Sequence, residues 1–367
     1  MATLKQIAAE AGVSVMTVSN VIHNNRSKVS PATVEKVQQL IEKYHYVPNM
    51  AARSLIAKES HIIAVLLPLW NKNSSSLLLD PYAGQLTGLI ETLLRERGYY
   101  IMLCSFETVE QALTTQQNWQ MDGAVMVLPH RDDITRAVLD QATTPLVIID
   151  RWYEDKTMLS VTADDRKGGY IAARHLLQLG HSRIGFASPG MAQSSIIQDR
   201  YQGFCQALME YGLAPEKAWM FFDYHNTFPE AADYGAWFVA QPVDGRPTAM
   251  VCTEDSIAVE IVKSVQGQGL RVPEALSVVG YDDSMPARLI SPALTTVRQD
   301  IRQKAEYAVE LLMDKIADPE IESRRRILDV DLVYRESVAD IREKNERAAN
   351  MREAHAVVWN VLFFAIF

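Results

Sequence analysis

Cysteine is scarce in this sequence, and long apolar runs are missing. Its three cysteines, Cys104, Cys205 and Cys252, stand far apart without a CxxC pair. This spacing argues against a disulfide framework, a zinc site and a redox dithiol. The longest apolar run, residues 357–367, covers 11 residues and contains Asn360, well short of the roughly 20 that cross a bilayer.

Other signals of special classes are also absent. The N-terminus lacks the basic and then apolar pattern of a secretory signal, and no low-complexity tract appears. The 17 glycines and 15 prolines are ordinary numbers for 367 residues. The sequence therefore favours a cytoplasmic protein of two or three folded domains, and we expect neither a cofactor nor a metal site.

Charge is distributed unevenly along the chain. Residues 1–60 carry seven Lys and Arg against four Asp and Glu, a net charge of +3, whereas the remainder carries 29 against 41, a net charge of −12. A polyanion would be attracted to the first 60 residues and repelled elsewhere. The pattern indicates a small basic module followed by an acidic body.

The basic module is predicted to contain three short helices. Thr3 begins a capping box and Gly12 ends the first helix; Ser14 caps the second, and Ser30 with Pro31 opens the third. Two helices joined by so short a turn are typical of a helix-turn-helix, whose second helix fits the DNA major groove. On this pattern alone, a helical cap that packs on the body remains the alternative.

The acidic body alternates apolar runs with amphipathic stretches. Strands are predicted at residues 62–67, 100–104, 124–128, 146–149, 183–187, 220–222, 249–252 and 277–281, with helices such as 166–179 and 256–268 between them. Continuous apolar strands are typical of parallel sheets covered on both faces. We therefore expect two doubly wound α/β subdomains that meet near residues 162–164.

Polar and aromatic residues follow many of these predicted strands. They are Trp70, Asp150 with Arg151 and Trp152, Asp223 with Tyr224, Glu254 with Asp255, and Asp282 with Asp283. Ligands of open α/β sheets bind beyond the carboxyl ends of the strands, so these side chains should converge on one cleft. Carboxylates that accept hydroxyl hydrogens, together with aromatic faces, predict a sugar or a nucleoside-like ligand.

Several segments closely resemble the LacI/GalR family of transcription regulators. In the basic module these are Thr3-Leu4-Lys5-Gln6-Ile7-Ala8, Ala11-Gly12-Val13-Ser14, Thr17-Val18-Ser19, Tyr46-Val47-Pro48-Asn49 and Ala52-Arg53-Ser54-Leu55. In the body they include Asp199-Arg200-Tyr201-Gln202-Gly203-Phe204 and Val278-Val279-Gly280-Tyr281-Asp282-Asp283. The resemblance covers residues 3 to about 339. It implies an all-α helix-turn-helix headpiece followed by a periplasmic-binding-protein-like α/β core.

The resemblance also implies domain boundaries. The headpiece would span residues 1–47, the hinge 48–59 and the core 60–340, with the chain crossing back between subdomains near 292 and 324. Nothing in the family core requires residues 341–367. We expect this segment to be an unpacked extension, with self-association or membrane adhesion as the alternatives.

The headpiece residues then acquire roles by resemblance. Val15, Met16 and Asn20 would contact bases, with His23 also pointing outward. The phosphate-binding residues would be Thr3, Ser14, Thr17, Ser19 and Asn24. Asn20 can bond adenine in a bidentate manner, whereas Val15 and Met16 suit a thymine methyl group. In the hinge, Leu55 would wedge into the minor groove beside Arg53. Burial of Val15 against a neighbouring helix and packing of Leu55 on the body are the alternatives.

The core residues acquire roles in the same way. Arg200 and Asp282 match positions that line the family's effector pocket, with Tyr224 and Asp255 beside them, and Tyr82 matches a pocket wall. The ligand set predicted from strand ends and resemblance together is Trp70, Tyr82, Asp150, Trp152, Arg200, Tyr224, Asp255 and Asp282. Capping by Asp282 and a structural ion pair of Arg200 are the alternatives, and His181 is expected to be structural.

These features predict a DNA-binding regulator, most simply a repressor, that acts as a homodimer on a near-palindromic operator and answers to a small sugar-like effector. It would have no membrane partner. A sugar-binding protein or a cleft enzyme acting on a sugar is the alternative.

An enzyme would use Asp282 with Asp283, or Glu254 with Asp255, as an acid/base pair. However, adjacent carboxylates at a strand end usually point apart, and no nucleophile-elbow, zinc-protease, phosphate-loop or dinucleotide motif stands in the right context.

Overall fold

The structure is a computed structural model that describes residues 3–22, 28–46, 59–69, 77–129, 132–190, 194–343 and 345. The chain divides into two compact units, residues 1–60 and residues 61–367.

The first unit contains three helices, as the sequence predicted. They are α1 (Leu4–Ala11), α2 (Val15–Ile22) and α3 (Pro31–Lys43). The predicted capping box is confirmed, because the Thr3 hydroxyl accepts from the Gln6 amide at 3.3 Å and the Gln6 side chain accepts from the Thr3 amide at 2.8 Å. Gly12 ends α1 with a left-handed φ of 72°. Ile7, Val18 and Val37, one from each helix, are fully buried and form the centre of a small apolar core.

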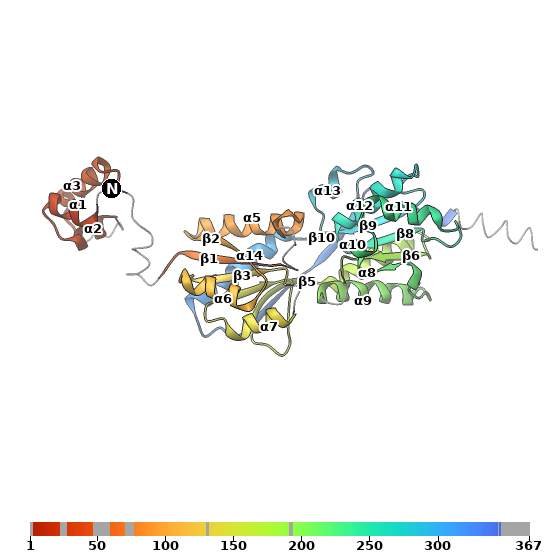
Figure 1. Ribbon diagram of the computed structural model, residues 1–367, viewed down its shortest axis with the longest axis horizontal. Coiled ribbons are helices and arrows are strands. Elements are labelled where there is room, and N and C mark those ends of the chain that lie inside the picture. Colours follow the sequence, from red (N-terminus) through yellow and green to blue (C-terminus); the bar gives the residue numbers. More distant parts are fainter. Residues whose placement is uncertain are drawn as a thin grey trace, which may run out of the picture. The chain divides into compact units, whose positions relative to one another are not determined.

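The second unit contains two subdomains, each a six-stranded sheet covered by helices on both faces (Figure 1). The first subdomain comprises β1 (Ile62–Pro68), η2 (Leu77–Leu79), α5 (Pro81–Glu96), β2 (Tyr100–Phe106), α6 (Val109–Asn118), β3 (Gly123–Val127), α7 (Asp132–Gln141), β4 (Leu146–Ile149), β5 (Leu159–Ala163), α14 (Ile301–Ala317) and β11 (Arg324–Leu328). The second comprises α8 (Asp165–Gln178), β6 (Ile184–Ala187), α9 (Ser195–Glu210), η3 (Lys217–Trp219), β7 (Met220–Phe221), α10 (Tyr224–Thr227), α11 (Ala231–Ala240), β8 (Ala249–Cys252), α12 (Asp255–Gly267), β9 (Ser277–Tyr281), α13 (Met285–Leu289), β10 (Thr295–Gln299) and β12 (Val330–Val333).

The first sheet has the strand order β11-β5-β4-β3-β1-β2, and all its strand pairs are parallel. Alternate strand residues such as Ile63 and Val65 pack under α5 and α14, whereas Ala64 and Leu66 pack under α6 and α7. Both faces are therefore buried, which explains the continuous apolar runs of the sequence.

The second sheet has the order β12-β10-β9-β8-β6-β7, parallel throughout except for the antiparallel pair of β10 with β12. One face packs against α8 and α9, and the other against α11 and α12. The expected fold class of two doubly wound parallel sheets is confirmed.

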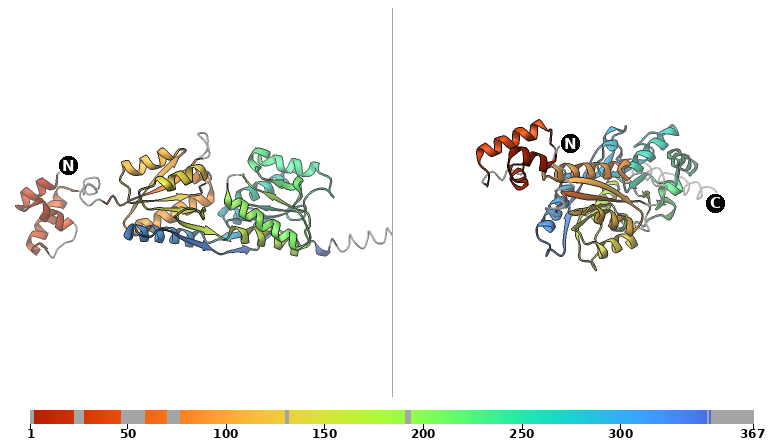
Figure 2. Two further views of the ribbon diagram at one scale, coloured as in Figure 1. Left: turned by 90° about the horizontal axis from the view of Figure 1, so that it is seen from below. Right: turned by 60° about the vertical axis from the view of Figure 1, so that its left-hand side comes forward.

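The chain passes between the two subdomains three times. It leaves the first sheet after β5, returns between Gln299 and Ile301, and crosses again between Leu328 and Val330. Figure 2 shows the late, blue part of the chain running along both subdomains. The two later crossings lie several residues beyond the expected positions near 292 and 324, because residues 295–299 still pair in the second sheet and residues 324–328 pair with β5 in the first.

Helices α8 and α9 cross where both have glycines. A Cβ atom on Gly169 would overlap the carbonyl oxygen of Arg200, and one on Gly203 would overlap that of Arg166. The close approach of the two backbones depends on these glycines, and it places Arg200 against the helix that carries Asp165.

We expect Gly169→Ala to destabilise the protein by at least about 1–3 kcal/mol, the usual cost of overpacking. Gly88→Ala is the matched control, because Gly88 is also within a helix and, apart from its chain neighbours and the backbone of its own helix, no atom of the described residues lies within 4 Å of an added Cβ. The control should be neutral or stabilising by about 0.5–1 kcal/mol. Urea unfolding of both variants checks this, and equal midpoints would contradict the close-packed crossing.

Candidate functional site

Helix α2 carries the residues predicted to contact DNA bases. The Ser14 hydroxyl caps this helix by accepting from the Thr17 amide at 3.1 Å. Val15 is 40% exposed and Met16 is 70% exposed, so neither apolar side chain is used to fill the core. Val15 is therefore not buried against a neighbouring helix, the alternative considered from sequence. Two exposed apolar side chains at the start of α2 suit contact with base methyl groups.

The structure also describes five other headpiece residues that were predicted to contact DNA. Asn20, Thr17 and Ser19 are half-buried on α2, and Thr3 and Ser14 are exposed at the starts of α1 and α2. Lys43 of α3 pairs with Glu10 of α1 at 2.6 Å. The predicted contacts His23, Asn24, Arg53 and Leu55 lie outside the described residues.

In the second unit, the strand ends of both subdomains carry aspartates with unusual backbone geometry. Asp150 follows β4 with a φ of 65°, and Asp282 follows β9 with a φ of 108°. Aspartate tolerates the left-handed region better than most residues, yet such conformations cost roughly 1–3 kcal/mol and often mark functional sites. In each sheet, one inner strand is therefore followed by an aspartate with an unusual backbone conformation.

These two aspartates are joined by a chain of hydrogen bonds, which we call the intersubdomain network: Tyr82, Asp150, Asp282, Gln299 and Lys304. The Lys304 ammonium donates to Asp150 Oδ1 at 2.5 Å, to the Tyr82 hydroxyl at 2.8 Å and to Gln299 Oε1 at 2.5 Å. The Tyr82 hydroxyl donates to Asp150 Oδ2 at 2.5 Å, and the Gln299 amide donates to Asp282 Oδ1 at 2.6 Å. The structure thus brings together Tyr82, Asp150 and Asp282.

Arg200 lies in a second buried group. Its Nε donates to Asp165 Oδ1 at 2.8 Å, and its guanidinium stacks 3.4 Å from the centre of the Tyr281 ring. The guanidinium also donates to the Thr253 carbonyl oxygen. Since the Tyr281 hydroxyl donates to the same Asp165 oxygen at 3.2 Å, Arg200 is fixed on several sides. The structural ion pair that was the alternative for Arg200 is present.

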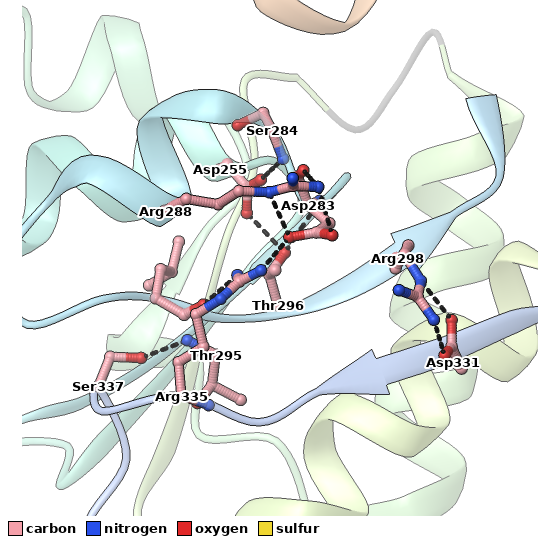
Figure 3. Close-up of polar contacts among 11 residues, drawn as sticks. Asp255, Asp283, Ser284, Arg288, Thr295, Thr296, Arg298, Asp331, Arg335 and Ser337 are labelled. Atoms are coloured by element: carbon pink, nitrogen blue, oxygen red, sulfur yellow. Dashed lines mark hydrogen bonds and ion pairs between the residues drawn. The ribbon is translucent and has the colours of Figure 1, made fainter. Parts of the chain in front are cut away.

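Two of the predicted strand-end carboxylates are occupied by protein groups (Figure 3). Asp255 accepts from the Ser284 amide at 2.7 Å and from the Thr296 hydroxyl at 2.6 Å, so both of its oxygens are used. Asp283 lies between Arg288 and Arg335 and pairs with both. Burial raises the pKa of Asp255 to about 6. Asp255 therefore holds the turn after β9 in place.

Glu254 and Asp282 are strand-end carboxyl groups for which the described residues provide no ion pair, and the protein bond at Asp282 comes from the Gln299 amide. Burial, reinforced by the charge of Asp80, raises the pKa of Glu254 to about 8. Burial also raises the pKa of Asp282 well above its ordinary value, against the opposing charge of Arg200. Sequence reasoning placed Glu254 at a strand end but preferred its neighbour Asp255 as the ligand contact.

The structure does not gather all the predicted ligand residues. Tyr224 is fully buried in the second subdomain, with its ring 5.5 Å from that of Phe228 and 6.4 Å from that of Tyr234, so it is a core residue. Trp152 is half-buried beneath the guanidinium of Arg325, 5.4 Å from the ring centre. Trp70 lies outside the described residues.

Sequence reasoning missed Lys304, Gln299 and Asp165. A signal for Lys304 was present, because it interrupts the apolar stripe of its helix between Ile301 and Ala308. A lysine at such a position needs a buried acceptor, which the sequence alone does not identify.

The described residues contain no group of three or more His, Cys, Asp or Glu side chains that could hold a metal ion. An enzyme would need both carboxyl groups of an adjacent pair, either Glu254 with Asp255 or Asp282 with Asp283. In each of these pairs, one carboxyl group is bonded by other protein groups. Asp255 is engaged by Ser284 and Thr296, and Asp283 by two arginines, so each pair retains one available carboxyl group. His181 is structural, since its Nε2 donates to the Ala339 carbonyl oxygen at 3.0 Å.

No helix within the described ranges has the length and apolar character needed to span a membrane. A helix-turn-helix unit and a core of two parallel α/β subdomains, with polar side chains at the strand ends of both, define a DNA-binding regulator with a ligand-binding core.

Comparisons with known proteins agree with this class. Residues 3–49 match bacterial regulatory proteins of the lacI family, and residues 173–338 match the periplasmic binding protein-like domain. The chain is 32% identical over 347 residues to the ribose operon repressor of Haemophilus influenzae, covering 93% of this chain and 100% of that protein. It therefore belongs to the lacI family of bacterial regulatory proteins.

Solved structures give the same result. A lac repressor dimer bound to operator and the anti-inducer ONPF is 26% identical, with a TM-score of 0.77 over 92% of this chain and 99% of that one. A lacI-family regulator from Enterococcus faecium with bound ribose is 25% identical, with a TM-score of 0.64 over 76% of this chain and 99% of that one.

Proposed function

We propose that this regulator is a repressor whose affinity for a near-palindromic operator is controlled by an uncharged, sugar-like ligand bound between the two core subdomains. The observation that carries the proposal is that the carboxyl groups of Glu254 and Asp282 lie beside the buried Arg200. The same chain has an α2 helix that is suited to contact with DNA bases. The relatives support it, since one is a ribose operon repressor and another holds ribose.

Charge favours an uncharged ligand over a phosphate or a carboxylate. Arg200 already pairs with Asp165, and Lys304 already pairs with Asp150. Glu254 and Asp282 form no ion pair among the described residues, and burial raises the pKa of both. An anion beside them would meet either uncompensated negative charge or carboxyl groups that must stay protonated. Hydroxyl groups can donate to these carboxylates and accept from Arg200 without that penalty.

Within the proposed site, we assign direct ligand contact to Asp282 and Glu254. Asp150 and Tyr82 are held by Lys304, so we expect them to orient the site rather than to supply its main hydrogen bonds. Asp255 and Arg200 would act mainly by fixing the strand ends, although one edge of the Arg200 guanidinium remains a candidate ligand donor.

A homodimer on operator DNA is the arrangement we propose for the whole protein, in the cytoplasm where DNA is accessible. The lac repressor relative is a dimer bound to operator. A dimer has two α2 helices that are related by two-fold symmetry. A DNA site with the same symmetry is an inverted repeat, in which each α2 contacts one half-site. The minor-groove role of Leu55 and Arg53 remains part of this proposal.

Replacing Asn20 with alanine should weaken binding to the cognate site by roughly 5- to 150-fold, because a bidentate contact to adenine contributes about 1–3 kcal/mol of discrimination. Binding to unrelated DNA should change little, since phosphate contacts do not depend on Asn20. Fluorescence anisotropy with both DNAs measures the two affinities. Gln38→Ala, an exposed amide on α3, is the matched control.

Selection of bound duplexes from a random DNA pool supplies the cognate site and tests the proposal. We expect enrichment of an inverted repeat whose half-sites change when Met16 and Asn20 are altered. A pool that shows no enrichment at physiological salt would contradict sequence-specific DNA binding.

A further inference from the structure

Lys304 is a buried cation on the apolar face of α14. Its side chain is fully buried, and its neighbours Ile301, Ala305 and Ala308 belong to the core of the first subdomain. Removing an ammonium group from water costs several kcal/mol unless acceptors replace the water. Lys304 has three acceptors, one for each of its protons: Tyr82, Asp150 and Gln299.

These acceptors come from both subdomains. Tyr82 lies in the first turn of α5, and Asp150 follows β4, so both belong to the first subdomain. Gln299 is the last residue of β10 in the second sheet, where it is opposite Val330 of β12. Lys304 therefore joins the two subdomains at the point where the chain crosses from one to the other.

Gln299 extends this link to the candidate ligand site. Its carbonyl oxygen accepts from Lys304, and its amide nitrogen donates to Asp282. Because an amide has a donor and an acceptor at fixed positions, a change at one end alters the geometry at the other. Gln299 is 4% exposed, so little water is available to replace a lost bond.

We propose that Lys304 is a positioning residue that couples Asp282 in the second subdomain to Tyr82 and Asp150 in the first. The coupling to a ligand rests on the proposed role of Asp282, whereas the mechanical link does not. A ligand that draws Asp282 away from Gln299 would release the Gln299 amide and change how Lys304 holds α5 and the end of β4. Ligand binding at Asp282 would then affect the first subdomain through Gln299 and Lys304.

Hydrogen exchange of the free, full-length protein tests this link without DNA or ligand, so failure of the proposed function would not affect it. The Asp282 amide bonds the Val297 carbonyl oxygen at 2.7 Å and reports on the geometry of that turn. Lys304→Met should raise exchange at residues 282–284 about tenfold, the factor for losing one net hydrogen bond of stabilisation.

Lys304→Met alone would leave Asp150 buried without its partner, so the decisive variant is Asp150→Asn/Lys304→Met, which removes both charges. Gln299→Met should also raise exchange at residues 282–284, while leaving the Lys304 pair with Asp150 intact. Lys315→Met is the matched control, because Lys315 lies on the same helix and bonds only the nearby carbonyl oxygens of Pro319 and Ile321 among the described residues.

The proposal predicts faster exchange at residues 282–284 in the double variant and in Gln299→Met, and no change there in Lys315→Met. Wild-type exchange at these residues in both test variants would show that Lys304 acts only within the first subdomain, and would overturn the proposal. Equal acceleration in the Lys315 control would overturn it as well.

Discussion

Replacing Asp282 with glycine should abolish the response of DNA binding to the ligand while leaving ligand-free DNA binding within a few fold of the wild type. Loss of hydrogen bonds to a carboxylate should weaken ligand binding by roughly 10- to 150-fold. Glycine is the informative replacement, because Asp282 has a φ of 108°, where alanine would add strain that glycine does not. The expected cost in stability is then limited to the lost bond from the Gln299 amide, about 1–3 kcal/mol.

Calorimetry with a neutral sugar that binds the wild type measures the loss directly. Asp282→Asn is the conservative comparison, since asparagine also tolerates a left-handed backbone and keeps an acceptor for the Gln299 amide. We expect it to lie between the wild type and Asp282→Gly. Ligand affinity within threefold of the wild type in Asp282→Gly would exclude Asp282 as a ligand contact.

The largest expected effect on stability comes from Arg200→Ala. This change would leave the Asp165 carboxylate buried without its partner, and breaking a buried ion pair from one side costs about 3–5 kcal/mol. The stacking of the guanidinium on Tyr281 would also be lost. Reduced ligand binding in this variant would therefore reflect partial unfolding as much as a missing contact.

Two comparisons separate these effects in denaturant unfolding. Arg200→Met/Asp165→Asn removes both charges and keeps an oxygen for the Tyr281 hydroxyl, so much of the stability should return. Arg298→Ala breaks an ion pair with Asp331 in which both side chains are about half exposed, and should cost no more than about 1 kcal/mol. An Arg200→Ala midpoint as high as that of Arg298→Ala would contradict the structural role of the buried pair.

Most of the fold could be predicted because a parallel strand that is buried on both faces has a continuous run of apolar residues in the sequence. Residues 146–149, 249–252 and 277–281 were predicted with the bounds that the structure gives. Strand β11 was missed because it begins with three arginines and lies at the edge of the first sheet, where exposed charged residues are tolerated. Strand β11 pairs with β5 because the chain returns to the first subdomain before it. The local sequence pattern does not predict this return.

The candidate site was predicted in part for a similar reason. Residues that follow parallel strands lie at one edge of a sheet, which singled out Asp150 in the first sheet and Asp282 in the second. Their link through Lys304 and Gln299 joins two sheets and could not be predicted from either one. Lys304 was missed because it follows Tyr82 by 222 residues and Asp150 by 154. Tyr224 was predicted as a ligand contact from its place after a strand and from the resemblance, whereas the structure buries it in the core. It too follows a strand, but its ring turns into an aromatic cluster that only tertiary packing defines.

The measurement that tests the central claim most directly is the affinity of the full-length protein for its selected operator with and without saturating neutral sugar, paired with its affinity for the sugar with and without operator. Linkage requires both affinities to change by the same factor. We predict a shared factor of at least about fivefold, lost in Asp282→Gly. An operator affinity that does not change at saturating ligand would contradict control of DNA binding from the core.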